Sequence, residues 1–183
     1  MKILCIGSSN TYGYDPRSYI GSRYPKEVRW TGRLDHFEAI NFGVNGLTIP
    51  CGIPVFIDVI RKHEPDLVVV MLGSNDLLEG ASAKQTCTRM EGYLDSIIGL
   101  GMPILLIAPP PFERGECVQS ETVMWESQKL GNLYRDLAAR KGCLFADAGK
   151  WDIEMTFDGI HFSPNGHDIF AQKLDEKLKK SGG

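Results

Sequence analysis

The chain has 183 residues, of which 43% are hydrophobic and 23% charged, and its formal net charge is -3. This composition is typical of a globular protein, and the length suits one domain that buries about two-thirds of the surface of the unfolded chain. We therefore expect a single domain over residues 1–183. The charge gives no reason to expect a nucleic-acid partner.

Short apolar runs alternate with longer amphipathic stretches along the chain. The runs, which predict strands buried on both faces, cover residues 2–7, 38–43, 66–73, 103–109 and 143–149. Helix-like patterns lie near residues 54–63, 82–100, 118–141 and 165–180. This alternation predicts a parallel five-stranded sheet with helices on both faces, which is a three-layer α/β/α sandwich.

Polar residues follow each predicted strand. In chain order, these stretches read "SSN", "GVNGLT", "GSND", "APPPFERGE" and "DGIHFSPNGH". Because ligands bind beyond the carboxyl ends of the strands in such sheets, we expect a functional site at this edge.

Asp158 and His161 are three residues apart in the last of these stretches. A carboxylate can fix the tautomer of an imidazole and leave the other ring nitrogen free to accept a proton. For these two residues alone, an Asp that caps a helix and a solvent-facing His are the simpler interpretation.

Asn75 and Gly46 follow the third and second predicted strands. A side-chain amide can donate to an oxyanion, and a glycine lets a backbone N–H approach a ligand closely. Singly, both are ordinary turn residues. Together with a serine hydroxyl after the first strand and the Asp/His pair, they supply every part of a serine acyl-transfer site.

Four motifs, in this order, resemble those of the SGNH (GDSL-type) hydrolases. They are "GSSN", the glycine of "GVNG", "GSND" and "DGIH", and they span Gly7 to His161. The resemblance implies a flavodoxin-like SGNH-hydrolase fold and a serine esterase or acylhydrolase that cleaves or transfers short acyl groups from small-molecule esters through an acyl-serine intermediate. Residues 23–34 and 108–116 further resemble the arylesterase or acyltransferase branch.

The resemblance also implies a role for each matched residue. Ser9 would be the nucleophile, His161 the base and Asp158 its orienting carboxylate. The backbone N–H groups of Ser9 and Gly46 and the side-chain amide of Asn75 would form the oxyanion hole.

Ser8 departs from the family pattern, which usually has Asp at this position. A carboxylate accepts backbone N–H bonds and stiffens the loop, whereas a hydroxyl does so more weakly. A catalytically weakened relative that binds acylated ligands without turnover is therefore one alternative function.

A flavodoxin-like module that binds a flavin or phosphate is another alternative, because a hydroxyl-rich loop after the first strand is where such proteins hold a phosphate. It does not account for Asp158, His161 and Asn75 together. The sequence has no zinc-type spacing of His and Cys and no GxGxxG or GxSxG motif, so we expect neither a metal nor a cofactor.

Substrate selectivity is expected in residues 12–30, in residues 109–116 and around Trp125, because loops at strand ends shape such pockets. For Met124 and Trp125, the buried face of a helix is an alternative. The aromatic and Arg-rich segment 14–33, which contains Tyr14, Tyr19, Ile20, Tyr24 and Trp30, suggests either an interface in a homo-oligomer or a lid.

The five cysteines form no CxxC pair, which fits a reducing compartment. The first residues lack a signal-peptide pattern, and no apolar stretch approaches the length of a membrane span. We therefore expect a cytoplasmic protein without a membrane partner.

Overall fold

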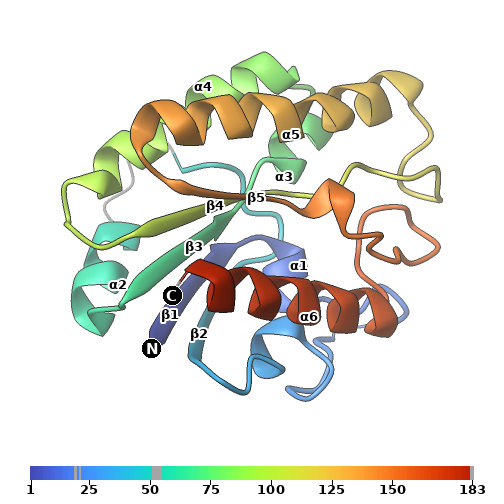
Figure 1. The fold of residues 1–183 in the computed structure, drawn as a ribbon. Helices are drawn as coiled ribbons and strands as arrows, with labels where there is room; N and C mark the ends of the chain where they lie inside the picture. Colours follow the sequence, from blue (N-terminus) through green and yellow to red (C-terminus); the bar gives the residue numbers. More distant parts are fainter. Residues whose placement is uncertain (19, 21, 51–54, 182–183) are drawn as a thin grey trace.

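The computed structural model describes residues 1–18, 20, 22–50 and 55–181 (Figure 1). Tyr19 and the first residue of the helix expected over 54–63 lie outside these residues. Within the described chain, no helix has the length and apolar character that a membrane crossing requires.

Five strands form one parallel sheet in the order β2-β1-β3-β4-β5. They are β1 (Lys2–Gly7), β2 (Glu38–Gly43), β3 (Leu67–Met71), β4 (Ile104–Ala108) and β5 (Leu144–Asp147). The predicted sheet is confirmed, although its last three strands are shorter than the apolar runs. For β3 the cause is Gly73, whose φ of 119° is not an extended conformation and turns the chain away from the sheet.

The four predicted helices are present, with small differences at their ends. They are α2 (Val55–His63), α4 (Ala83–Ile98), α5 (Glu121–Lys141) and α6 (Pro164–Ser181). A capping box between Ser82 and Gln85 begins α4, and Gly142 in the left-handed conformation ends α5. The structure adds two short helices, α1 (Ser9–Tyr12) and α3 (Ser74–Leu78), and two 3-10 turns, η1 (Trp30–Gly32) and η2 (Ala148–Lys150).

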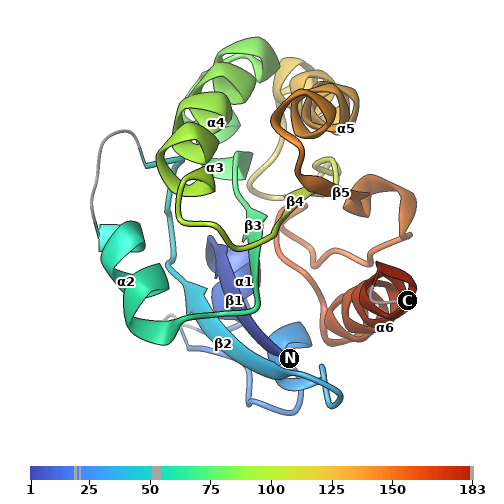
Figure 2. The ribbon, with the colours of Figure 1, turned by 60° about the vertical axis from the view of Figure 1, so that its left-hand side comes forward.

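The helices cover the two faces of the sheet (Figure 2). Side chains alternate along β1, so Leu4 packs with α2, α4 and α5 on one face, and Ile3 packs with η1 and α6 on the other. Trp30 and Phe170 are fully buried on the second face, with their rings 4.8 Å apart. These two cores make the three-layer sandwich that the sequence predicts.

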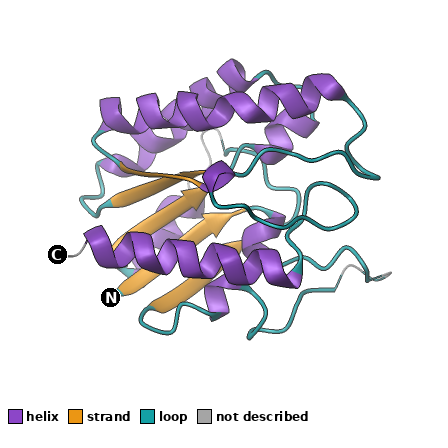
Figure 3. Cartoon of the chain, turned by 45° about the vertical axis from the view of Figure 1, so that its right-hand side comes forward, coloured by secondary structure: helices purple, strands orange, loops and turns teal. Residues whose placement is uncertain are grey.

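The polar loops gather at one end of the sheet (Figure 3). The last residue of β1, Gly7, pairs with Gly43 of β2 and Met71 of β3, so these strands end at the same level. The loops that contain Ser9, Gly46 and Asn75 therefore begin side by side.

Candidate active site

Ser9 is the first residue of α1, directly after the turn that ends β1. The backbone N–H groups of Thr11 and Tyr12 donate to the Ser8 carbonyl at 3.0 and 2.8 Å. The turn also requires glycine at position 7, because a Cβ there would lie 2.0 Å from Thr11 Oγ1. Local geometry therefore holds Ser9 at the carboxyl end of β1.

The Ser8 side chain makes no cap hydrogen bond to α1. The loop is held instead by its neighbour Asn10, whose Nδ2 donates to the Ile160 carbonyl at 3.0 Å. Asn10 Oδ1 accepts from the Phe162 N–H at 2.9 Å, and the Asn10 carbonyl accepts from Trp30 Nε1 at 3.0 Å. Asn10 thus provides the stiffening that a carboxylate at position 8 is expected to give.

The His161 ring lies between a carboxylate and a hydroxyl. Its Nδ1 is 2.6 Å from Asp158 Oδ2, and its Nε2 is 3.0 Å from Ser9 Oγ. Because an ionised carboxylate can only accept, Nδ1 carries the hydrogen in this pair, and Nε2 of the neutral ring is an acceptor for the Ser9 hydroxyl. The simpler interpretation of a helix-capping Asp and a solvent-facing His is wrong, since Asp158 is buried and Ser163 Oγ accepts from the first turn of α6.

Asp158 is ionised despite its burial. Its Oδ1 accepts from Thr156 Oγ1 at 2.8 Å and from the N–H groups of Ile160 and His161 at 2.8 and 3.0 Å. Burial acts to raise the pKa of this carboxyl, but the hydrogen bonds from His161 and Ile160 together outweigh it and hold the pKa well below its ordinary value. A negative charge therefore faces His161 Nδ1 at neutral pH.

The loop after β4 is hydrogen-bonded to the backbone of the loop that contains Asp158. The Glu113 N–H donates to the Gly159 carbonyl at 3.1 Å, and the Cys117 N–H donates to the Asp158 carbonyl at 3.2 Å. Gly115 allows this close approach, because a Cβ there would lie 2.4 Å from the backbone of Asp158. The stretch 109–116 thus contacts the site, where the sequence places part of the selectivity.

The loop that contains Gly46 follows β2 and is hydrogen-bonded to the last residue of β1 and to the segment that follows β3. The Val44 N–H donates to the Gly7 carbonyl at 3.0 Å, and Asn75 Nδ2 donates to the Leu47 carbonyl at 2.9 Å. Gly46 itself has a φ of 72°, which favours glycine. An amide group has two N–H donors, so this bond leaves Asn75 one N–H for a ligand.

Tyr14, which lies in the stretch 12–30 where the sequence places part of the selectivity, is a neighbour of His161. The two rings are tilted by 53° with centroids 4.8 Å apart, and the Tyr14 N–H donates to the Ser9 carbonyl at 3.0 Å. Tyr14 therefore packs on the imidazole.

Segment 14–33 is not a uniformly exposed aromatic surface. Tyr24 and Trp30 are buried, because Trp30 packs under α6 and the Tyr24 ring packs against His167. Within the described part of this segment, Ile20 is strongly exposed. The interface suggested by its aromatic residues is therefore wrong for Tyr24 and Trp30.

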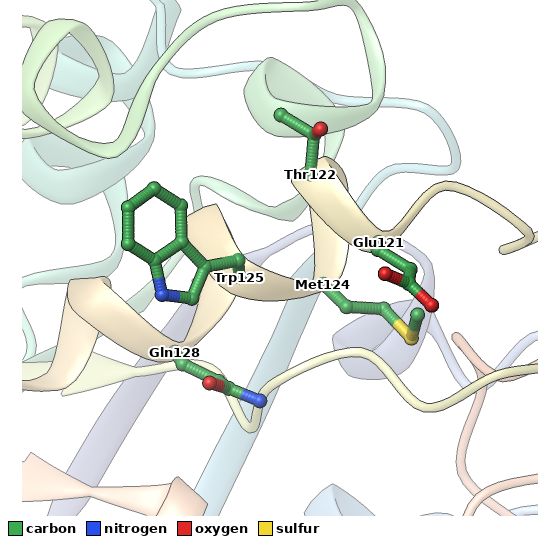
Figure 4. Close-up of a pocket in the computed structure, with 5 residues that line it drawn as sticks. All are labelled: Glu121, Thr122, Met124, Trp125 and Gln128. Carbon is green, nitrogen blue, oxygen red and sulfur yellow. The ribbon is translucent and has the colours of Figure 1, made fainter.

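Trp125 lines a surface pocket at the start of α5 (Figure 4). The pocket has a volume of about 480 Å³ and is lined by Glu121, Thr122, Met124, Trp125 and Gln128. Trp125 is 62% exposed, and the Lys129 ammonium lies 3.4 Å from the ring centroid. The alternative of a buried helix face is therefore wrong for Trp125, whereas Met124 is partly buried and packs against the core.

Among the described residues, no group of three or more His, Cys, Asp or Glu side chains could hold a metal ion. The arrangement around His161 consists of a hydroxyl, an imidazole, a carboxylate and neighbouring amide donors. Such groups can carry out nucleophilic acyl transfer by themselves.

The chain is similar to a known protein family and to several known proteins. The model of the GDSL-like Lipase/Acylhydrolase family matches residues 5–169. An arylesterase of Vibrio mimicus is 28% identical over 120 residues, which are 60% of this chain and 56% of that protein. The chain thus matches little more than half the length of this relative.

Solved structures resemble the chain over nearly all of its length. The native aryl esterase of M. smegmatis is 26% identical with a TM-score of 0.85, and the match covers 98% of both chains. A carbohydrate acetylesterase family member from Sinorhizobium meliloti is 27% identical with a TM-score of 0.85, covering 98% of this chain and 97% of the other. The predicted fold and the resemblance to the SGNH (GDSL-type) hydrolases are confirmed.

Proposed function

The chain belongs to the GDSL-like lipase/acylhydrolase family, and we propose that it is a serine esterase that cleaves short acyl groups from small-molecule esters. The observation that carries this proposal is the position of the His161 ring, with Nε2 3.0 Å from Ser9 Oγ and Nδ1 2.6 Å from Asp158 Oδ2. This geometry suits a base that removes the proton of a serine nucleophile.

In the first half of the reaction, Ser9 Oγ attacks the ester carbonyl carbon. His161 Nε2 takes the hydroxyl proton, and the Asp158 carboxylate stabilises the imidazolium that forms. The carbonyl π electrons move to the oxygen, which becomes an oxyanion. When this tetrahedral intermediate collapses, the bond to the leaving alcohol breaks, His161 gives the proton to that alcohol, and an acyl-serine remains.

Three donors would hold the oxyanion: the N–H groups of Ser9 and Gly46 and the free N–H of the Asn75 amide. Donors that are already in place cost no reorganisation when charge develops, so they lower the barrier. The hydrogen bonds that link the loops of these residues support this role.

In the second half, water attacks the acyl-serine, with His161 as the base. The bond between the acyl carbon and Ser9 Oγ breaks, His161 returns the proton that it took from water to Ser9 Oγ, and the carboxylic acid is released. Another acceptor alcohol in place of water would make the same step an acyl transfer.

The name of one similar protein, a carbohydrate acetylesterase family member, supports esters with a small acyl group, and the name of another, an aryl esterase, supports ester hydrolysis. The flavin-binding alternative has less support, because it gives no role to the contacts among Ser9, His161 and Asp158. The weakened-relative alternative also loses support, because Asn10 holds the loop that Ser8 leaves uncapped. The cytoplasmic location and the homo-oligomer stay predictions.

Hydrolysis of p-nitrophenyl acetate by the purified protein and by Ser9→Ala tests the proposal. We expect turnover in the parent protein and loss of turnover in the variant. Mass spectrometry after inactivation by a p-nitrophenyl phosphonate should find one adduct, on Ser9. Equal hydrolysis by both proteins would contradict the proposal, and a yellow protein with flavin absorbance would favour the binding module.

A further inference from the structure

Two adjacent side chains of the third motif, Asn75 and Asp76, both hold the loop that contains Gly46. Asn75 Nδ2 donates to the Leu47 carbonyl at 2.9 Å, and Asp76 Oδ2 accepts from the Ile49 N–H at 3.0 Å. The segment that follows Gly46 is therefore fastened at two points, two residues apart.

Asp76 is fully buried, and α4 supplies its counter-charge. Arg89 Nη1 donates to Asp76 Oδ1 at 2.8 Å, and the Arg89 side chain is 44% exposed. Each oxygen of the carboxylate thus has a separate donor, one from a helix and one from the loop. Hydrogen bonds to a charged acceptor are stronger than neutral ones, so the bond to Ile49 is a firm anchor.

A contribution to the free energy of unfolding does not by itself explain the Asp76–Arg89 ion pair. The cost of removing two charges from water often exceeds their mutual attraction, and apolar residues of similar volume frequently stabilise a protein as well or better. What the carboxylate provides is a charged acceptor on each side, one for the Ile49 N–H and one for Arg89 Nη1. An apolar residue has no acceptor, and an amide has only one acceptor oxygen, with a donor NH2 in place of the other.

The loop depends on such anchors, because packing does not hold its tip. Val44 is 44% exposed, and a Cβ built on Gly46 would meet no atom of the described residues within 4 Å. The tip is tied to the rest of the site by the Val44 N–H on the Gly7 carbonyl, and on its other side by Asn75 and Asp76.

We propose that Asp76, paired with Arg89, is a positioning residue that keeps the Gly46 N–H aimed at the oxyanion. Asp76 acts through the loop and does not touch the substrate. This inference rests on the proposed esterase function, because the Gly46 N–H matters only if an oxyanion forms at Ser9.

Steady-state kinetics with p-nitrophenyl acetate test the role. Removing an oxyanion donor outright costs on the order of 10²- to 10³-fold in kcat, so a donor that is displaced in part should cost about tenfold or more. We expect this loss in Asp76→Asn and Arg89→Met, with KM changed by less than about threefold. Arg89→Lys should recover part of kcat, because it retains the positive charge.

Arg140→Met is the control, because it also removes an ion pair that involves α4. Arg140 of α5 contacts Glu91 Oε2 of α4 at 3.5 Å, so this variant removes an Arg–carboxylate contact of α4 outside the loop of Gly46. Its kcat should equal that of the parent. An unchanged kcat in folded Asp76→Asn would overturn the proposal.

Binding of phenylboronic acid separates positioning from a general loss of stability. The boronate on Ser9 carries its negative oxygen in the oxyanion hole, so its Ki should rise by the same factor by which kcat/KM falls. Urea titration measures the fraction of each variant that is unfolded. If the loss of activity equals this fraction and the Ki is unchanged, Asp76 has a structural role only, and the proposal is overturned.

Amide hydrogen exchange followed by NMR gives a readout that needs no turnover. Asp76→Asn should speed exchange of the Ile49 N–H by about tenfold or more, and Arg140→Met should leave it unchanged. The exchange measurement and the Ser9 assay test different claims, so a negative result in one leaves the other claim standing. Unchanged Ile49 exchange overturns the anchoring role of Asp76, whereas hydrolysis that does not depend on Ser9 overturns the proposed esterase function.

Discussion

Asn10 Oδ1 accepts a hydrogen bond from the backbone N–H of Phe162 at 2.9 Å, across 152 residues of sequence. On the other side of His161, the Ile160 carbonyl accepts from Asn10 Nδ2 at 3.0 Å. One side chain thus joins the turn of Ser9 to both residues that flank His161. The distance between Ser9 Oγ and His161 Nε2 depends on this bridge.

Asn10→Ala should therefore lower both activity and stability. It leaves the buried N–H of Phe162 and the carbonyl of Ile160 without this partner, at a cost of about 1–3 kcal/mol in the free energy of unfolding. A misplacement of about 1 Å between reacting groups can cost on the order of 10²-fold in rate, so we expect a loss of that size in kcat. Urea titration and p-nitrophenyl acetate kinetics measure the two effects.

The control for this variant is Asn165→Ala, which removes an exposed amide that donates to Glu154 Oε2 at 2.8 Å. This substitution should leave kcat unchanged. If folded Asn10→Ala kept the kcat of the parent, the bridge would have no part in aligning Ser9 and His161.

The adjacent serines should behave differently. The Ser8 hydroxyl makes no cap hydrogen bond, so we expect Ser8→Ala to change kcat by less than about threefold, which is below about 0.7 kcal/mol. Ser8→Asp restores the usual family residue and should give no gain, because Asn10 already holds the loop. Parallel assays with Ser9→Ala measure the contrast, and a tenfold gain in Ser8→Asp would revive the weakened-relative alternative.

The sheet and the long helices could be predicted because their signals are local. A run such as residues 67–71 is apolar throughout since both faces of the strand are buried, and α5 repeats its apolar residues with the helical period. Helices α1 and α3 span four and five residues, which is too short for a period to appear. Their presence follows from the turns after Gly7 and Gly73.

The site was predictable only in part, for a related reason. The resemblance named Ser9, Asp158 and His161, and the structure places them in contact. Asn10 and Asp76 stood inside the same motifs without a role, because their partners are backbone groups 152 and 27 residues away. Every residue except proline has a backbone N–H, so the sequence does not indicate which of these groups a side chain will contact. Such contacts can be identified only in the folded structure.

Asn75→Ala should lower kcat on the order of 10²- to 10³-fold if its amide donates to the oxyanion. Asn75→Asp should lose at least as much, because a carboxylate cannot donate and repels the developing charge. KM should change little in both, since the donor acts mainly in the transition state.

The matched control is Asn132→Ala, an amide on α5 that accepts from Arg135 Nη1 at 3.2 Å. Its kcat should equal that of the parent. A larger effect on KM than on kcat in Asn75→Ala would mean that the amide binds the ground state of the substrate, against the assigned role.

His167 should make the protein less stable in mild acid. The side chain is fully buried at the start of α6, where Nδ1 accepts from the Trp30 N–H at 3.4 Å. Burial above all, and then the charges of Arg29 and Arg33, lower the pKa of His167 from 6.5 to about 3.

Between these two values the unfolded chain binds a proton at His167 that the folded chain does not, so stability falls as pH decreases below 6.5. We expect a loss of about 2 kcal/mol in the free energy of unfolding from pH 7 to pH 5, measured by urea titration. Asp158 adds nothing in this window, because its folded-state pKa is lowered and its contribution is lost only at more acidic pH. His167→Gln should remove this loss of stability between pH 7 and pH 5, and the control His63→Gln should keep it. An equal loss in both variants would assign the pH dependence to other groups.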